Sequence, residues 1–169
     1  MLKKIIPFAV GIIVLGACNN SSGDKEAAKD SSMMDHSDMH QMDAGDATVP
    51  EIPAVPDGAK IFFKNLKNGA QVTSPFKVEM GVEGIKVDTA GPVLAGVGHH
   101  HLLIDAGDSI ATGQMIPKDS AHVHFGKGQT ETEVSLSPGR HHLTLQFADG
   151  LHRSYGSRMA TSVNVTVKK

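Results

Sequence analysis

Histidine and methionine are the residues whose types and spacing most clearly predict chemistry in this chain. Ten His and eight Met stand beside a single Cys in 169 residues. Two His-x-His pairs, His99 with His101 and His122 with His124, would each place two imidazoles on one face of an extended strand, roughly 6.5–7 Å apart. On neighbouring strands the two pairs would form a four-imidazole site for Cu(II), Zn(II) or Ni(II). The alternative is that these histidines fill polar strand positions at a sheet edge.

A second group of soft ligands lies closer to the N-terminus, in sequence with no period of 2 or 3.6. It consists of Met33, Met34, His36, Met39, His40 and Met42. Thioether sulfur selects Cu(I), whereas imidazole serves Cu(II), Ni(II) and Zn(II). The group resembles the Met/His-rich tracts of periplasmic copper-handling proteins, which implies copper capture. A polar spacer enriched in Met by chance is the alternative.

The remaining histidines suggest other roles. His141 follows a Pro-Gly turn, and we expect it to bond the backbone of that turn. His142 should face outward. His152 lies in a turn between strands, where it is either a loop contact or a further metal ligand. Asp105 and Glu131 are candidates to orient ligand histidines by hydrogen bonds.

Composition excludes several classes of function. A formal net charge of −2 and an aromatic content of 4% exclude a nucleic-acid-binding surface. One Cys excludes an internal disulfide framework, a Cys-based zinc finger and an iron–sulfur cluster within one chain. The segment 126–131 lacks the residue order of a phosphate loop, so no nucleotide is expected. No hydrolase motif is present; we therefore expect a protein that is not an enzyme, with an open catalytic metal site as the alternative.

The N-terminus has the pattern of an export signal. Lys3 and Lys4 precede an apolar run, residues 5–15, that is too short for a permanent membrane span. The following Leu-Gly-Ala-Cys sequence resembles the lipobox of bacterial lipoproteins, which implies cleavage of a signal peptide over residues 1–17 and acylation of Cys18. The lipid would anchor the chain in the cell envelope, and Asn19 is typical of sorting to the outer membrane. An ordinary secretory signal with an incidental Cys is the alternative.

Two further segments follow the signal peptide. Residues 18–58 are rich in Ser, Asp, Ala, Gly and Pro, which predicts a disordered tether. Residues 59–169 show short alternating runs, such as 76–82, 141–147 and 163–167, and no helical stripe. They predict an all-β domain, an immunoglobulin-like antiparallel β-sandwich of about seven strands.

The predicted strands determine which histidines share a face. On a strand through residues 99–105, His99 and His101 point to one side and Leu102 and Ile104 to the other. The longest connection, about 106–120, is long enough to be functional.

Three segments carry a resemblance to a known family. They are Gly98-His-His-His-Leu-Leu-Ile-Asp105, His124-Phe-Gly-Lys-Gly-Gln-Thr-Glu131 and Pro138-Gly-Arg-His-His-Leu-Thr-Leu145. Together they resemble a family of small secreted bacterial domains of unknown function over roughly residues 59–168. The resemblance implies a β-sandwich in an export compartment and supplies no activity or ligand. By motif position His99, His100, His101, His124, His141 and His152 match the family pattern, whereas His122 and His142 depart from it.

These observations predict a lipid-anchored, cell-envelope protein that binds a metal, with copper favoured over zinc and nickel. The tether would capture the metal, and the His cluster of the sandwich would hold or relay it. The alternative is a non-catalytic envelope module that binds a protein or a glycan and whose histidines are structural. Converging imidazoles would favour the first reading, and dispersed ones the second.

Overall fold

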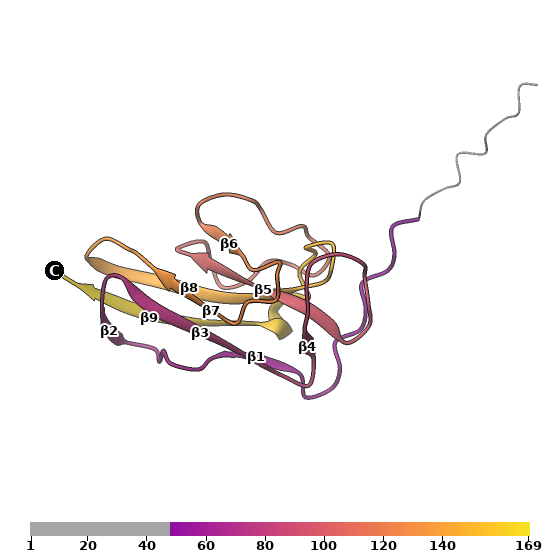
Figure 1. The fold of residues 1–169 in the computed structure, drawn as a ribbon, viewed down its shortest axis with the longest axis horizontal. Helices are drawn as coiled ribbons and strands as arrows, with labels where there is room; N and C mark the ends of the chain where they lie inside the picture. Colours follow the sequence, from indigo (N-terminus) through magenta and orange to yellow (C-terminus); the bar gives the residue numbers. More distant parts are fainter. Residues whose placement is uncertain (1–47) are drawn as a thin grey trace, which may run out of the picture. The chain divides into compact units, whose positions relative to one another are not determined.

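The structure, a computed structural model, describes residues 48–169. These residues form nine β-strands and one short 3-10 helix, arranged in two sheets (Figure 1). Among the described residues no helix has the length and apolar character needed to cross a membrane. The predicted signal peptide, the lipidation site Cys18 and the Met/His group between Met33 and Met42 lie outside the described residues.

The smaller sheet has the strand order β1-β3-β7 and is antiparallel. The larger sheet has the order β2-β9-β8-β5-β4, and β6 also pairs with β5. The strands are β1 (Lys60–Phe63), β2 (Ala70–Thr73), β3 (Phe76–Glu83), β4 (Lys86–Val87), β5 (Val97–Ile104), β6 (His122–His124), β7 (Glu131–Val134), β8 (Gly139–Ala148) and β9 (Ala160–Lys168), with the 3-10 helix at Ser157–Met159.

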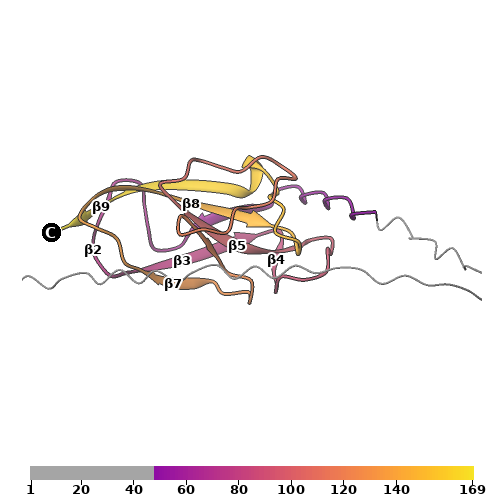
Figure 2. The ribbon, with the colours of Figure 1, turned by 90° about the horizontal axis from the view of Figure 1, so that it is seen from above.

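The core lies between the two sheets (Figure 2). Val78 and Met80 of β3 are fully buried, and so are Leu102 of β5 and Leu145 of β8. Leu102 and Leu145 are register partners, so the apolar faces of β5 and β8 point the same way, toward the smaller sheet. Burial of such side chains stabilises a fold by about 1.5–3 kcal/mol each.

The prediction of an all-β sandwich is confirmed. The strands expected over 76–82, 141–147 and 163–167 are present as β3, β8 and β9. Two pairings are parallel, β2 with β9 and β4 with β5, so the sandwich is not purely antiparallel. β2 and β4 are short and pair with strands that are distant in sequence. Neither an alternating pattern nor a hairpin turn therefore predicts them.

The outer face of the larger sheet is covered by the connection between β5 and β6, residues 105–121, which we call the β5–β6 connection. Thr144 and Gln146 of β8 point to this face and are fully buried. Thr144 Oγ1 donates to the carbonyl of Gly107 at 2.7 Å, and the Ile110 N–H donates to Gln146 Oε1 at 2.9 Å. The expected long connection therefore packs on the sheet face that carries His99 and His101.

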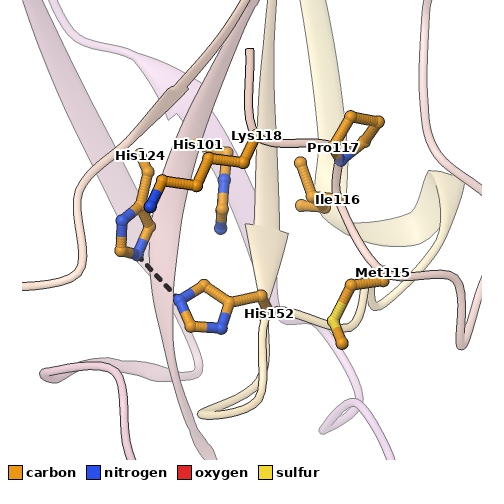
Figure 3. A pocket seen from close by; sticks show the side chains of 7 residues that line it. All are labelled: His101, Met115, Ile116, Pro117, Lys118, His124 and His152. Carbon is orange, nitrogen blue, oxygen red and sulfur yellow. Dashed lines mark hydrogen bonds between the residues drawn. The ribbon is translucent and has the colours of Figure 1, made fainter. Parts of the chain in front are cut away.

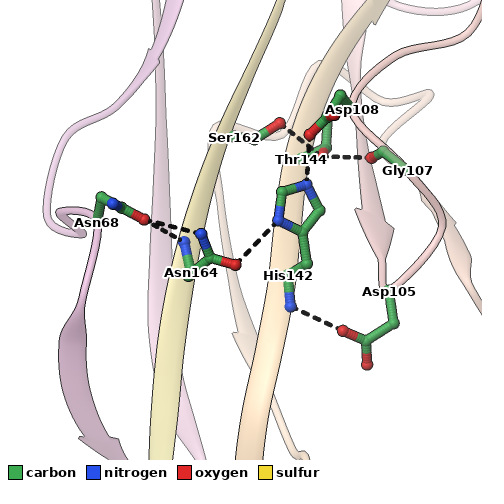
Figure 4. A network of polar contacts seen from close by, with 8 residues as sticks. All are labelled: Asn68, Asp105, Gly107, Asp108, His142, Thr144, Ser162 and Asn164. Carbon is green, nitrogen blue, oxygen red and sulfur yellow. Dashed lines mark hydrogen bonds and ion pairs between the residues drawn. The ribbon is translucent and has the colours of Figure 1, made fainter.

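A polar network holds the first residues of this connection on β8 and β9 (Figure 4). Asp105 accepts the backbone N–H of His142 at 2.7 Å, and the His142 ring lies 2.8 Å from Asp108 and 3.2 Å from Asn164. His142 lies on the outer face of the sheet, as expected, and there it contacts the β5–β6 connection.

Candidate metal centre

Strand β5 contributes two imidazoles to one buried point. His99 and His101 alternate with His100 and Leu102, so they project from the outer face of the sheet, as the sequence predicts. Both side chains are almost completely inaccessible to solvent. Their Nε2 atoms lie 3.0 Å apart.

Strand β6 contributes a third imidazole. The adjacency of β5 and β6, which the sequence left open, is present, and His124 is the direct partner of His101 in their register. His122 is the partner of Leu103, two pairs further from His99. Its Nδ1 lies 2.7 Å from Asp119 Oδ1 in the β5–β6 connection. The strand register therefore brings His124 into the cluster and leaves His122 outside it, unlike the arrangement expected from the two His-x-His pairs.

The fourth imidazole comes from the turn that follows β8. His152 Nε2 lies 3.1 Å from His124 Nε2. The backbone of His152 has φ 66°, in the left-handed region that non-glycine residues rarely adopt. The His152 N–H donates to the carbonyl of Asp149, and the His152 carbonyl accepts the N–H of Ile116. A strained backbone conformation of this kind persists only where the surrounding structure holds the residue in place.

Asp149 holds this turn in place. It is fully buried, its Oδ1 accepts the N–H groups of Leu151 and Arg153, and its Oδ2 accepts Arg153 Nε at 2.8 Å. The buried carboxylate is thereby paired with a guanidinium, as a charge in the interior requires. No periodicity points to a role for Asp149, because its partners lie within four residues on an irregular turn.

The four rings form a compact cluster. The six distances between their centroids range from 4.6 to 6.1 Å. Ligand atoms of His99, His101 and His124 all lie within 4.8 Å of one another. For comparison, nitrogens at about 2.0 Å from a tetrahedral metal are about 3.3 Å apart. The cluster can hold a metal ion with small ring movements.

Burial keeps these imidazoles in the form that binds metal. Burial, followed by the neighbouring imidazoles, lowers the pKa of His99 to about 4 and that of His101 to about 2. Burial and the charges of His152 and Lys118 also lower the pKa of His124. At neutral pH these three rings are therefore uncharged, which is the state in which an imidazole binds a metal.

The hydrogen bond between His99 and His101 leaves one buried ring N–H without a partner. A hydrogen bond between two Nε2 atoms requires the accepting ring to carry its proton on Nδ1. The Nδ1 atoms of His99 and His101 are both buried, and neither has a hydrogen-bond partner among the described residues. The metal-free cluster therefore buries an unpaired N–H, which costs about 1–3 kcal/mol.

The residues expected to orient the ligands have other partners. Asp105 lies 2.8 Å from His141 Nδ1, and Glu131 forms an ion pair with Lys77 at 2.8 Å. His141 Nε2 donates to the carbonyl of Ser137 at 2.9 Å, which confirms the structural role predicted for His141.

A pocket opens beside the cluster, with a volume of about 280 Å³. One wall is formed by His101, His124 and His152, and the opposite wall by Met115, Ile116 and Pro117 of the β5–β6 connection (Figure 3). Lys118 of the same connection extends toward the His124 ring. No periodicity in the sequence identified these four, because they lie on a loop that only the tertiary fold brings to the histidines.

Gly126 is needed beside the cluster for a steric reason. A Cβ atom at this position would overlap Cε1 and Nε2 of His124. No pattern in the sequence reveals this requirement, since the ring that Gly126 accommodates is identified by the fold.

Comparison with known proteins assigns a family. Residues 78–168, more than half of the chain, match the family described as Domain of unknown function (DUF4399). The chain belongs to this family, and the matched region contains all four clustered histidines. No curated protein and no solved structure matches the chain.

Proposed function

We propose that this member of the DUF4399 family is a lipid-anchored protein of the bacterial cell envelope that captures copper and holds or relays it. The proposal is carried by the convergence of His99, His101, His124 and His152 from two strands and a turn. Dispersed histidines would instead have favoured a module that binds a protein or a glycan. Three or four imidazoles that converge from two strands and a turn form the donor set of a metal site.

The chemistry of the donors supports copper over zinc and nickel. A site made of imidazoles accepts Cu(II), Zn(II) and Ni(II), and Cu(II) has the highest affinity in the series of divalent metals. We call residues 33–42, to which we assign copper capture, the capture segment. The thioethers of Met33, Met34, Met39 and Met42 would give this segment a preference for Cu(I). Copper is the metal that suits both groups of ligands.

The start of the domain lies beside the cluster. Arg153, the residue after His152, donates from Nη1 to the carbonyl of Pro50 at 2.6 Å. The first described residues therefore contact the residue that follows His152. Acylation of Cys18 would keep the chain at the membrane.

The pocket beside the cluster supports binding rather than catalysis. A metal-assisted hydrolysis needs a general base close to the open coordination position. None of the seven residues that line the pocket carries a carboxylate. We therefore propose a binding protein and not an enzyme.

The experiment is a metal titration of the soluble chain that starts at Asn19, which contains all of the described structure. We expect Cu(II) to bind with a dissociation constant below about 10 μM, a free energy of about 7 kcal/mol. The variant H99Q/H101Q should lose the domain site, whereas H122Q/H142Q, a matched pair outside the cluster, should retain it. The proposal is wrong if no copper binds, or if both variants lose affinity equally.

A further inference from the structure

The pocket beside the histidine cluster is larger than a metal ion requires. Its volume of about 280 Å³ exceeds that needed for a single water. Ile116 is buried, while Met115, Pro117 and Lys118 line the rim and are exposed to solvent. The pocket is therefore open to a dissolved molecule and touches the face of the cluster formed by His101, His124 and His152.

The charges around this pocket favour an anion. A divalent ion held by imidazoles keeps its full charge, because these ligands are neutral. Lys118 adds a positive charge; it extends toward the His124 ring in the pocket (Figure 3). The buried carboxylate nearest in sequence to His152, Asp149, is neutralised by Arg153 and does not line the pocket. Thus nothing among the lining residues compensates the positive charge.

The wall opposite the histidines favours an apolar group. Met115, Ile116 and Pro117 present a thioether chain, a branched chain and a ring, and the surface that lines the pocket is mainly apolar. Small-molecule pockets typically combine such a wall with a few polar groups that fix the orientation of the ligand. An inorganic anion would leave this wall without a contact.

We infer that the pocket binds a small organic carboxylate, with its carboxylate on the cluster metal and toward Lys118 and its apolar part against Met115 and Ile116. The inference rests on the proposed function, since the metal in the His cluster supplies one contact. On this inference the site binds a small organic carboxylate in addition to the metal ion that it holds or relays. A carboxylate would add a further ligand to the four imidazoles proposed to hold the metal.

The test uses Co(II), whose visible spectrum reports its ligands, in the soluble chain from Asn19 carrying H36Q and H40Q. These two substitutions remove the histidines of the capture segment. Acetate, propionate and butyrate are titrated at constant ionic strength. We expect a saturable spectral change whose affinity rises up to about fourfold for each added methylene, corresponding to about 0.8 kcal/mol.

Three variants separate the contacts of the carboxylate from those of the metal. K118Q should weaken carboxylate binding at least threefold without lowering Co(II) affinity, since it removes a positive charge from beside the metal. K127Q, a matched control at an exposed lysine outside the pocket, should change neither. M115A should reduce the gain in affinity from acetate to butyrate.

The outcomes distinguish this inference from the proposed function. If Co(II) binds and carboxylates leave its spectrum unchanged, the inference fails and the metal site stands. If carboxylates bind with equal affinity in K118Q, M115A and the parent chain, the pocket is not their site and the inference fails as well. If Co(II), Cu(II) and Zn(II) all fail to bind the domain, both proposals fall.

Discussion

Three consecutive histidines have two different surroundings because side chains alternate along a strand. His99 and His101 join the cluster, while His100 faces the core, 5.1 Å from the Phe147 ring between centroids. Neither nitrogen of His100 has a hydrogen-bond partner among the described residues. Burial and the charge of Lys64 lower the pKa of His100 to about 4. One strand thus buries three imidazoles in their neutral form.

These lowered pKa values predict that the metal-free protein loses stability in mild acid. Below pH 6.5 unfolded His100 binds a proton that the folded residue binds only near pH 4, so the free energy of unfolding falls as the pH drops through this window. His99 and His101 act in the same direction. The free energy of unfolding, measured with urea, should therefore fall by about 2 kcal/mol less between pH 7 and pH 5 in H100L than in the parent chain.

His141 provides an internal contrast to this prediction. Hydrogen bonds to Asp105 and then to Ser137 raise its pKa, so it contributes stability at low pH that fades as the pH rises. It therefore cannot cause a loss of stability in acid. A free energy of unfolding that stays constant between pH 7 and 5 in the metal-free chain would contradict the buried neutral imidazoles.

The left-handed backbone of His152 predicts that a substitution here can lower metal affinity without lowering the stability of the fold. Asn adopts positive φ more readily than His and has no imidazole. H152N should therefore unfold within about 0.5 kcal/mol of the parent, or be more stable, while its copper affinity falls at least tenfold. The checks are urea unfolding without metal and a competitive copper titration; unchanged affinity would remove His152 from the site.

At the scale of elements, the register between β5 and β6 selects which histidines meet. Direct pairing of His101 with His124 places the second imidazole of β6, His122, beyond the reach of His99. The turn after β6 then has to leave room for the His124 ring, and Gly126 provides that room. Strand pairing and one glycine together orient the ligand.

Substitution of Gly126 tests this arrangement. G126A should push the His124 ring aside and lower copper affinity at least tenfold, while the sheet content measured by circular dichroism stays the same. In the H124Q background the same substitution should have no further effect on affinity, because the ring it displaces is gone. Additive losses in the double variant would show that Gly126 acts elsewhere.

Alternation of apolar and polar residues predicts much of the fold and part of the candidate site. The strands through Phe76, His101 and Leu145 follow from period-two patterns, and the face shared by His99 and His101 follows from the same rule. The register that excludes His122 depends on long-range pairing, which no local pattern encodes. Asp149, Met115 and Lys118 lie on turns and connections, where position is set by tertiary contacts.

At the scale of the whole molecule, the sandwich serves as a rigid support for one outer face. The core between the sheets fixes β5 and β8, and the β5–β6 connection closes over the opposite side of β5, where the histidines lie. Sites built on strands hold their ligands more accurately than sites built only on loops. The proposed lipid and capture segment would add location and supply to this support.

The proposed anchor predicts where the full chain is found in a bacterial cell. The chain expressed with its own residues 1–17 should partition with membranes and carry a lipid on Cys18, whereas C18S should appear in the soluble envelope fraction or keep its signal peptide. Cell fractionation and mass spectrometry of the N-terminus provide the readout. Recovery of the parent chain as an unmodified soluble protein would contradict the anchor and leave the metal site untouched.

Anomalous diffraction from crystals grown with copper shows whether the clustered imidazoles bind a metal. We expect an anomalous peak about 2.0–2.1 Å from nitrogens of His99, His101 and His124, with His152 as the fourth ligand. A copper-saturated crystal whose peaks lie only at other residues, with the four rings still in contact, would contradict it.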